Sequence, residues 1–190
     1  MDIYSYLTIA LTLFYTGTLM RLAGGFPSAL KKEKRYSVHY LSIVAVFLFT
    51  IFAFWNGWAL HKTKWTLFKF MVASIEPALY YFLATTLVPE NTSEVKSWKT
   101  YFWEVKNKYF LVLMLQLINI QVAGYVLMDF NPLDPKQLGA LFGFLPLLIG
   151  FITKKHWIVF TITIIYILQV LIMALTIASE PGWLLDGPDF

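Results

Sequence analysis

The sequence contains no cysteine, and its charged residues are scarce. Without cysteine, disulfides, thiolate nucleophiles, cysteine-ligated zinc and iron–sulfur clusters are all excluded. Charged residues make up 14% of the 190 residues and hydrophobic residues 58%, whereas about a quarter of an average soluble domain is charged. So few charges cannot solvate a compact surface of this size, which excludes an ordinary soluble enzyme. We predict one integral membrane domain covering residues 1–190.

Long apolar runs recur along the chain, with charged breaks between them. A membrane-spanning helix needs about 20 mostly apolar residues to cross about 30 Å of hydrocarbon. The run at 138–153 is the weakest because it is short and rich in glycine, so a re-entrant or broken helix is the alternative there. The pattern predicts an all-α fold, a polytopic transmembrane bundle of about six spans. The predicted spans cover residues 3–23, 38–60, 67–88, 109–130, 138–153 and 157–178.

The segment 94–108 precedes the predicted fourth span and is itself amphipathic. Its apolar residues recur at spacings of three and four, and its lysines occupy other faces. This pattern predicts a short interfacial helix that lies on the cytoplasmic leaflet. The alternative is an extension of the fourth span that docks a partner.

Lysine and arginine are distributed unevenly between the segments that connect the predicted spans. Counting Arg21 and Lys69, which lie near the ends of predicted spans, eleven of the fifteen lie on the side of the segments after the first, third and fifth spans, and only four lie on the other side. Basic residues are concentrated in cytoplasmic loops. We therefore predict that both termini lie outside and that the basic loops lie in the cytoplasm.

One ionisable side chain falls near the middle of a predicted span. Glu76 lies nine residues into the third span, or about 13 Å along a helix. A carboxyl at this depth is costly and by default marks a function, here a site that responds to protons or cations. The alternative is a neutral carboxyl that joins helices by hydrogen bonding. Pro77 follows at once and removes a backbone donor, so the helix can bend here.

Carboxamide side chains in the predicted spans are the other candidates for this site. Gln116 and Asn119 are three residues apart in the fourth span and share a face, and we expect them to meet Glu76 in the bundle interior. The predicted pore, proton or ion site comprises Glu76, Gln116, Asn119, Gln169 and Asn56.

The loops that we predict to be cytoplasmic carry basic and aromatic residues. Each lysine or arginine near an anionic membrane surface contributes about 1 kcal/mol to binding, although the same residues are also the ordinary topology signal. We predict contact with lipid or with a protein partner at Lys31, Lys32, Lys34, Arg35, Trp98 and Lys99.

Motifs of enzymes and cofactor sites are missing. The sequence has no HExxH, GxSxG, phosphate-loop or dinucleotide-binding pattern. Its three histidines lie near the predicted membrane surfaces, whereas two histidines that ligate haem need matched depth inside the bilayer. We predict that the protein is not an enzyme, holds no cofactor or metal, and does not bind nucleic acid directly.

A pattern of aromatic residues and prolines runs through residues 38–110. It consists of Val38-His39 at the start of a span, Trp55-Asn56-Gly57-Trp58-Ala59-Leu60, Trp65, Pro77, Tyr80-Tyr81, Leu87-Val88-Pro89 and Tyr101-Phe102. In these residues the chain resembles a family of small, uncharacterised bacterial multi-span inner-membrane proteins. The resemblance implies a protein of the bacterial cytoplasmic (inner) membrane and implies no activity.

Two classes of function fit these observations. The first is a small oligomeric membrane channel or ion-translocating protein, with the mid-membrane carboxylate of Glu76 on the path. The second is a membrane-embedded sensor or adaptor, of an envelope-stress or phage-defence type, that couples the bilayer to a cytosolic partner. Gly139, Gly143 and Gly150 in the predicted fifth span favour close helix contact, and we expect a homo-oligomer.

Overall fold

The computed structural model of the chain describes residues 3–131 and 142–176. In these ranges every regular element is helical, as the sequence predicts. Five helical segments are long and apolar enough to cross a membrane, and one of them joins α2 to the 3-10 helix η1. The elements are α1 (Ile3–Ala29), α2 (Ser37–Asn56), η1 (Gly57–Lys62), α3 (Leu67–Leu87), α4 (Trp98–Met128), α6 (Phe144–Ile152) and α7 (His156–Thr176).

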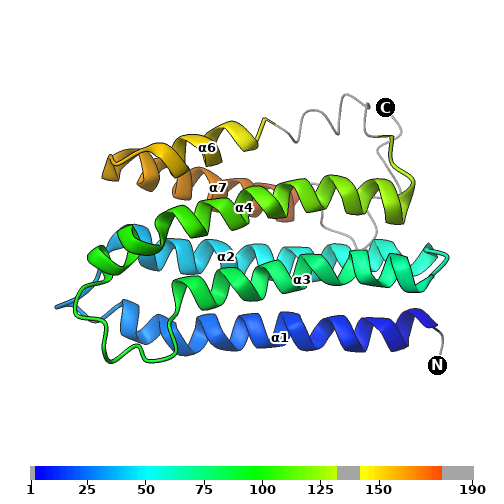
Figure 1. Cartoon of the computed structure of the whole chain (residues 1–190), viewed down its shortest axis with the longest axis horizontal. Helices are drawn as coiled ribbons and strands as arrows, with labels where there is room; N and C mark the ends of the chain where they lie inside the picture. Colours follow the sequence, from blue (N-terminus) through cyan, green and yellow to red (C-terminus); the bar gives the residue numbers. More distant parts are fainter. Residues whose placement is uncertain (1–2, 132–141, 177–190) are drawn as a thin grey trace.

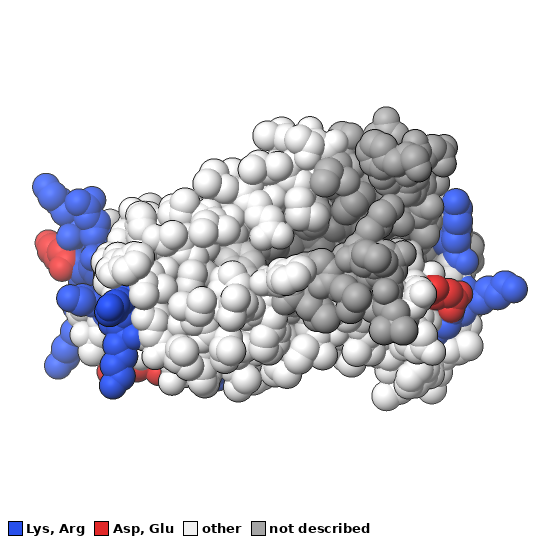
Figure 2. Space-filling view, turned by 90° about the horizontal axis from the view of Figure 1, so that it is seen from above, with Lys and Arg blue, Asp and Glu red and all other residues white. Residues whose placement is uncertain are grey.

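The helices α1 to α4 run side by side along the longest dimension of the molecule (Figure 1). The turns 30–36, 88–97 and 153–155 lie at one end, which we call the basic end. Figure 2 shows lysine and arginine side chains gathered at the two ends, with a belt of other residues between them. Charge at the ends and an apolar belt between them are the surface of a multi-pass membrane protein. The side of the membrane that the basic end faces stays a prediction.

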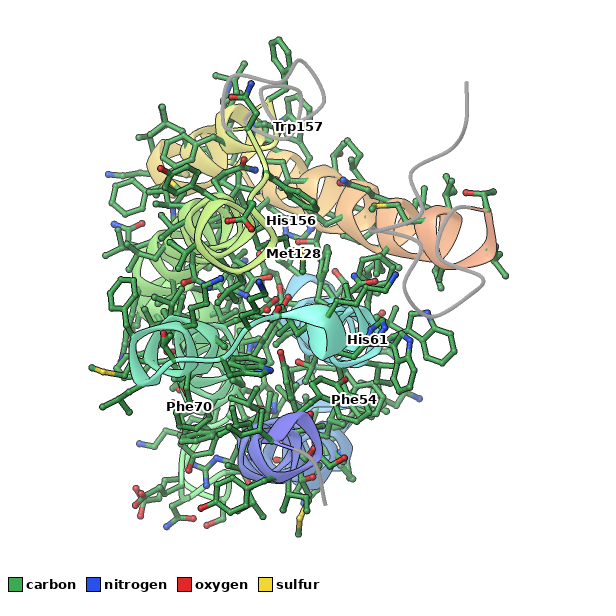
Figure 3. All side chains as sticks on the ribbon, turned by 90° about the vertical axis from the view of Figure 1, so that its right-hand side faces the viewer. Phe54, His61, Phe70, Met128, His156 and Trp157 are labelled. Atoms are coloured by element: carbon green, nitrogen blue, oxygen red, sulfur yellow. The ribbon has the colours of Figure 1, made fainter. Side chains whose placement is uncertain are left out.

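The central helix is α3. It packs against α1 and α4, and these are the two most extensive helix contacts in the described part of the molecule. Helix α2 packs against α1 and α7, and α6 packs against α4 and α7. In Figure 3, which looks from the end opposite the basic end, α1 to α4 are seen nearly end on, whereas α7 runs across the view. Helix α7 is therefore tilted against the bundle.

The predicted fifth span corresponds to a short helix. Helix α6 has 9 residues, from Phe144 to Ile152, which is about 13 Å of helix and too short to cross the hydrocarbon. Residues 138–141 of the predicted span lie outside the described residues. The count of about six spans is therefore not confirmed, and the structure supports five.

Residues 98–108 do not form a separate interfacial helix. They are the first third of α4, which continues without a break for 31 residues from Trp98 to Met128. The helix begins after Ser97, whose side-chain oxygen accepts a hydrogen bond from the backbone nitrogen of Thr100 at 3.4 Å. The prediction of an interfacial helix at 94–108 is corrected to an extension of the fourth span. The reason is that no residue after Ser97 interrupts the helical hydrogen bonding.

Two glycines allow close approach between helices. A Cβ atom at Gly25 of α1 would meet the side chain of Val88, and a Cβ atom at Gly150 of α6 would meet the ring of Phe110 on α4. Gly150 therefore serves close contact between α6 and α4 within the chain.

Candidate intramembrane carboxyl site

Glu76 lies in the middle of α3 and is half-buried. The helix starts after Thr66, whose side-chain oxygen accepts a hydrogen bond from the backbone nitrogen of Lys69 at 3.2 Å. It then runs through Pro77 and ends at Leu87 as one element. Because the helix is continuous on both sides of Pro77, Glu76 is held at a fixed depth within the bundle.

Gln116 of α4 is the hydrogen-bond partner of Glu76. Its Nε2 donates to Oε1 of Glu76 at 3.4 Å. Tyr80 follows Glu76 by one helical turn on α3, and it lines the same cavity as Gln116. One hydrogen bond thus joins the carboxyl of Glu76 on α3 to a carboxamide on α4.

Helix α1 completes the site with Tyr15. The rings of Tyr15 and Tyr80 have centroids 6.3 Å apart, and both side chains are buried. The site is therefore formed by three helices, with one carboxyl, one carboxamide and two phenols.

Asn119 lies close to this site without bonding to it. It follows Gln116 by almost one turn on α4 and is 7% exposed. Its Nδ2 and the Oε1 of Gln116 are both buried and have no hydrogen-bond partner among the described residues. The structure thus brings Gln116 to Glu76, and it places Asn119 on the same buried face.

The other two predicted site residues lie elsewhere. Asn56 is the last residue of α2, at the end opposite the basic end, and so lies at a different depth from Glu76. Gln169 is exposed on α7, a helix that contacts mainly α2. The structure therefore does not bring either residue next to Glu76, because helical depth alone did not indicate which face of each helix is turned inward.

No ion pair joins Glu76 to a lysine or arginine in the part of the chain that the structure describes, and no basic residue is a neighbour of the site there. A carboxyl with only neutral partners can gain or lose a proton without breaking a salt bridge. Chemically, the arrangement fits proton uptake and release, or the temporary binding of a small cation. Groups of three or more histidine and acidic residues that could hold a metal ion are absent from the described ranges.

A cavity of about 80 Å³ adjoins the site between α2, α3, α4, α6 and α7. Its wall is mainly apolar, and the lining residues that carry a polar group are Tyr80, Tyr109, Gln116, Thr163 and Tyr166. A space of this size can hold water where it has polar partners. Gln116 lies at the boundary of the cavity and the Glu76 site, so it is in contact with both.

Sequence reasoning did not assign Tyr15 or Tyr80 to the site. Tyr80 could have been predicted, because it lies four residues after Glu76 and therefore shares its face of α3. Tyr15 could not have been predicted from the sequence, because its contact with α3 depends on how α1 packs.

One lysine at the basic end points into the protein interior. Lys106 is 5% exposed, and its Nζ donates to the carbonyl oxygens of Gly150, Phe151 and Thr153 at 3.0, 2.6 and 2.7 Å. The last carbonyls of a helix have no partner within it, and a positive charge is favourable there. Lys106 therefore caps the end of α6.

Trp98 and His39 pack together near the same end. Their rings stack at 4.4 Å between centroids with an angle of 15° between the planes, and both residues are fully buried. The indole nitrogen of Trp98 donates to the carbonyl oxygen of Ser28 at 2.9 Å. Trp98 is therefore part of the core of the described bundle, whereas the sequence predicted it at a surface that contacts lipid or a partner.

The remaining residues that we predicted to contact lipid or a partner lie at the surface. Lys31, Lys32, Arg35 and Lys99 are exposed, and Lys34 is half-buried. Nearby, the hydroxyl of Tyr36 shares a hydrogen bond of 2.7 Å with Nδ1 of His156, and burial raises the pKa of this hydroxyl above its usual value. The start of α7 is thus attached to the turn that carries the lysines.

No protein-family model matches the chain, and neither the curated proteins nor the solved structures contain a match. The resemblance of residues 38–110 to bacterial inner-membrane proteins therefore stays a prediction.

Proposed function

We propose that the protein translocates protons, or a small cation in exchange for protons, across a membrane, with Glu76 as the group that takes up and releases the proton. One observation carries this proposal. The carboxyl of Glu76 lies in the middle of an apolar helix and accepts a hydrogen bond from the neutral amide of Gln116. Ionisable groups inside membrane helices are rare because they are costly, and they mark proton and ion pathways.

The packing around Glu76 favours a gated path over an open pore. Leu83 and Leu87 follow Glu76 on the same side of α3 and are fully buried. Buried leucines therefore separate the carboxyl of Glu76 from the basic end of the molecule. Proton exchange with that side then requires a change in helix packing, as in a carrier.

The setting of this activity is part of the proposal. We place the protein in the bacterial cytoplasmic membrane as a homo-oligomer, with both termini outside and the basic end in the cytoplasm. The uneven distribution of lysine and arginine supports this orientation.

A second candidate is a membrane-embedded sensor or adaptor that couples the bilayer to a cytosolic partner. The observation in its favour is the exposed group formed by Lys31, Lys32 and Arg35 at the basic end. Such a group binds anionic headgroups or an acidic protein surface. In this case Glu76 is a structural carboxyl.

Proton flux in proteoliposomes distinguishes the two candidates. A pH gradient is applied across vesicles that contain the wild type, Glu76→Gln or Ser74→Ala, and the internal pH is followed with a trapped dye. Ser74 is the matched control on α3, because its hydroxyl bonds only locally, to the carbonyl oxygen of Phe70 at 2.8 Å. We expect Ser74→Ala to equal the wild type and Glu76→Gln to reduce flux by about a hundredfold, as loss of an essential proton-transfer group does. Wild-type flux in Glu76→Gln contradicts the proposal, and absence of flux in all three favours the sensor.

A further inference from the structure

Gln169 is an exposed carboxamide in the membrane-crossing part of α7. It is the fourteenth of the 21 residues of this helix and lies about 20 Å along the axis from His156. No hydrogen bond joins it to another residue that the structure describes. The other carboxamides deep in the spans differ in exposure, since Gln116 and Asn119 are buried and Gln121 is half-buried.

In a membrane-spanning helix, an exposed carboxamide indicates a contact with another protein chain more strongly than an exposed hydroxyl does. A threonine on a helix can bond to the carbonyl one turn earlier, as Thr176 does to Ile172 at 2.7 Å. A glutamine amide has two donors and an acceptor, and hydrocarbon offers no partner for them. Lipid chains can cover the aliphatic surface of α7, but they cannot satisfy Gln169.

We propose that α7 is the interface with a second copy of this chain and that the Gln169 side chains of the two copies hydrogen-bond to each other. Copies inserted in the same orientation are related by an axis along the membrane normal, which brings identical residues to the same depth. An amide carries both a donor and an acceptor, so two copies of Gln169 are complementary to each other. Interhelical amide bonds of this kind stabilise association in membranes.

The surface around Gln169 suits a helix pair. Ile165, Leu168, Ile172 and Leu175 are all exposed, and they follow one another at spacings of three, four and three residues. Alternation of three and four is the pattern of two helices that cross at a small left-handed angle. Helix α7 is tilted against α1 to α4 (Figure 3).

The proposed α7 interface specifies which surface forms the homo-oligomer. It rests on the proposed function only in assuming that the protein spans a membrane. It does not depend on what Glu76 does. Cross-linking through α7 and proton flux are separate measurements, so one proposal can fail while the other stands.

The absence of cysteine from the chain makes the contact measurable. Single cysteines are introduced by Ile165→Cys and Ile172→Cys, one turn before and one turn after Gln169, so that the glutamine is kept. Leu13→Cys on α1 is the matched control, because Leu13 is also a highly exposed aliphatic residue of a spanning helix. The full-length variants are oxidised in lipid nanodiscs or native membranes with copper phenanthroline, and dimers are separated without reductant.

We expect a disulfide-linked dimer from at least one α7 cysteine and only the background level from Leu13→Cys. Adding Gln169→Leu to the same cysteine variant should weaken the association roughly threefold to thirtyfold, which is the range of an interhelical hydrogen bond. Cross-linking at α7 no greater than at Leu13 overturns the proposal. Cross-linking at α7 that Gln169→Leu leaves unchanged also overturns it, because the amide pair is then not part of the interface.

Discussion

The amide of Gln116 reaches across from α4 to the carboxyl of Glu76 on α3, with 3.4 Å between Nε2 and Oε1. This contact joins the two helices that share the most extensive interface in the described bundle. It also places the mid-membrane carboxyl next to a neutral partner, so the charge state of Glu76 can change without the loss of an ion pair.

Lys106 should be a stabilising residue in spite of its charge. Lys106→Met keeps the length of the side chain and removes three hydrogen bonds to the end of α6. We expect the free energy of unfolding to fall by about 2 kcal/mol or more, because bonds from a charged group are strong and the carbonyls are left unpaired. Lys99→Met is the control at an exposed position and should change stability by less than about 0.5 kcal/mol. Equal unfolding midpoints in denaturant for the two variants would contradict the capping role.

Two neighbouring glycines of α1 should respond in opposite directions. A Cβ atom at Gly25 would meet the side chain of Val88, whereas a Cβ atom at Gly24 has no atom within 4 Å. Gly25→Ala should lower the free energy of unfolding by about 1–3 kcal/mol through overpacking. Gly24→Ala should raise it by about 0.5–1 kcal/mol, because alanine favours the helix. Thermal unfolding in detergent measures both, and stabilisation by Gly25→Ala would show that α1 does not approach Val88.

His39 should stabilise the fold through the packing of its ring and not through hydrogen bonds of its nitrogens. The ring stacks on Trp98, and neither nitrogen has a partner among the described residues. His39→Phe should therefore leave stability unchanged or raise it, since it removes two unsatisfied groups and keeps the stacking. His39→Ala should lower the free energy of unfolding by about 3 kcal/mol, as loss of a buried ring usually does. Tryptophan fluorescence reports the unfolding of both variants, and a large loss in His39→Phe would indicate a polar role for the imidazole.

Hydropathy and helical periodicity predict much of this fold. The all-helical class follows from apolar runs of about 20 residues, and the shared face of Gln116 and Asn119 follows from their spacing of three. These features are local, so they can be read along one segment. The same reasoning placed Glu76 near the middle of its helix, because this depth depends only on the distance from the ends of its own span.

The remaining features depend on contacts between segments that are far apart in the sequence. Tyr15 reaches the Glu76 site only because α1 packs on α3. Lys106 lies among basic residues that signal topology, and its inward direction depends on where α6 ends. In the described residues of the apolar run that predicted a fifth span, the helix has 9 residues. Periodicity does not contain this information, so these features required the three-dimensional structure.

Proton uptake and release by Glu76 can be followed directly by infrared difference spectroscopy of the protein in lipid bilayers while the pH is stepped. In the wild type we predict a carboxyl C=O band whose intensity changes with pH. This band should be missing from Glu76→Gln, and it should be retained in Glu33→Gln, which changes an exposed carboxyl at the basic end. A pH-dependent difference spectrum that is the same in the wild type and in Glu76→Gln would contradict a proton-exchanging role and make Glu76 a structural carboxyl.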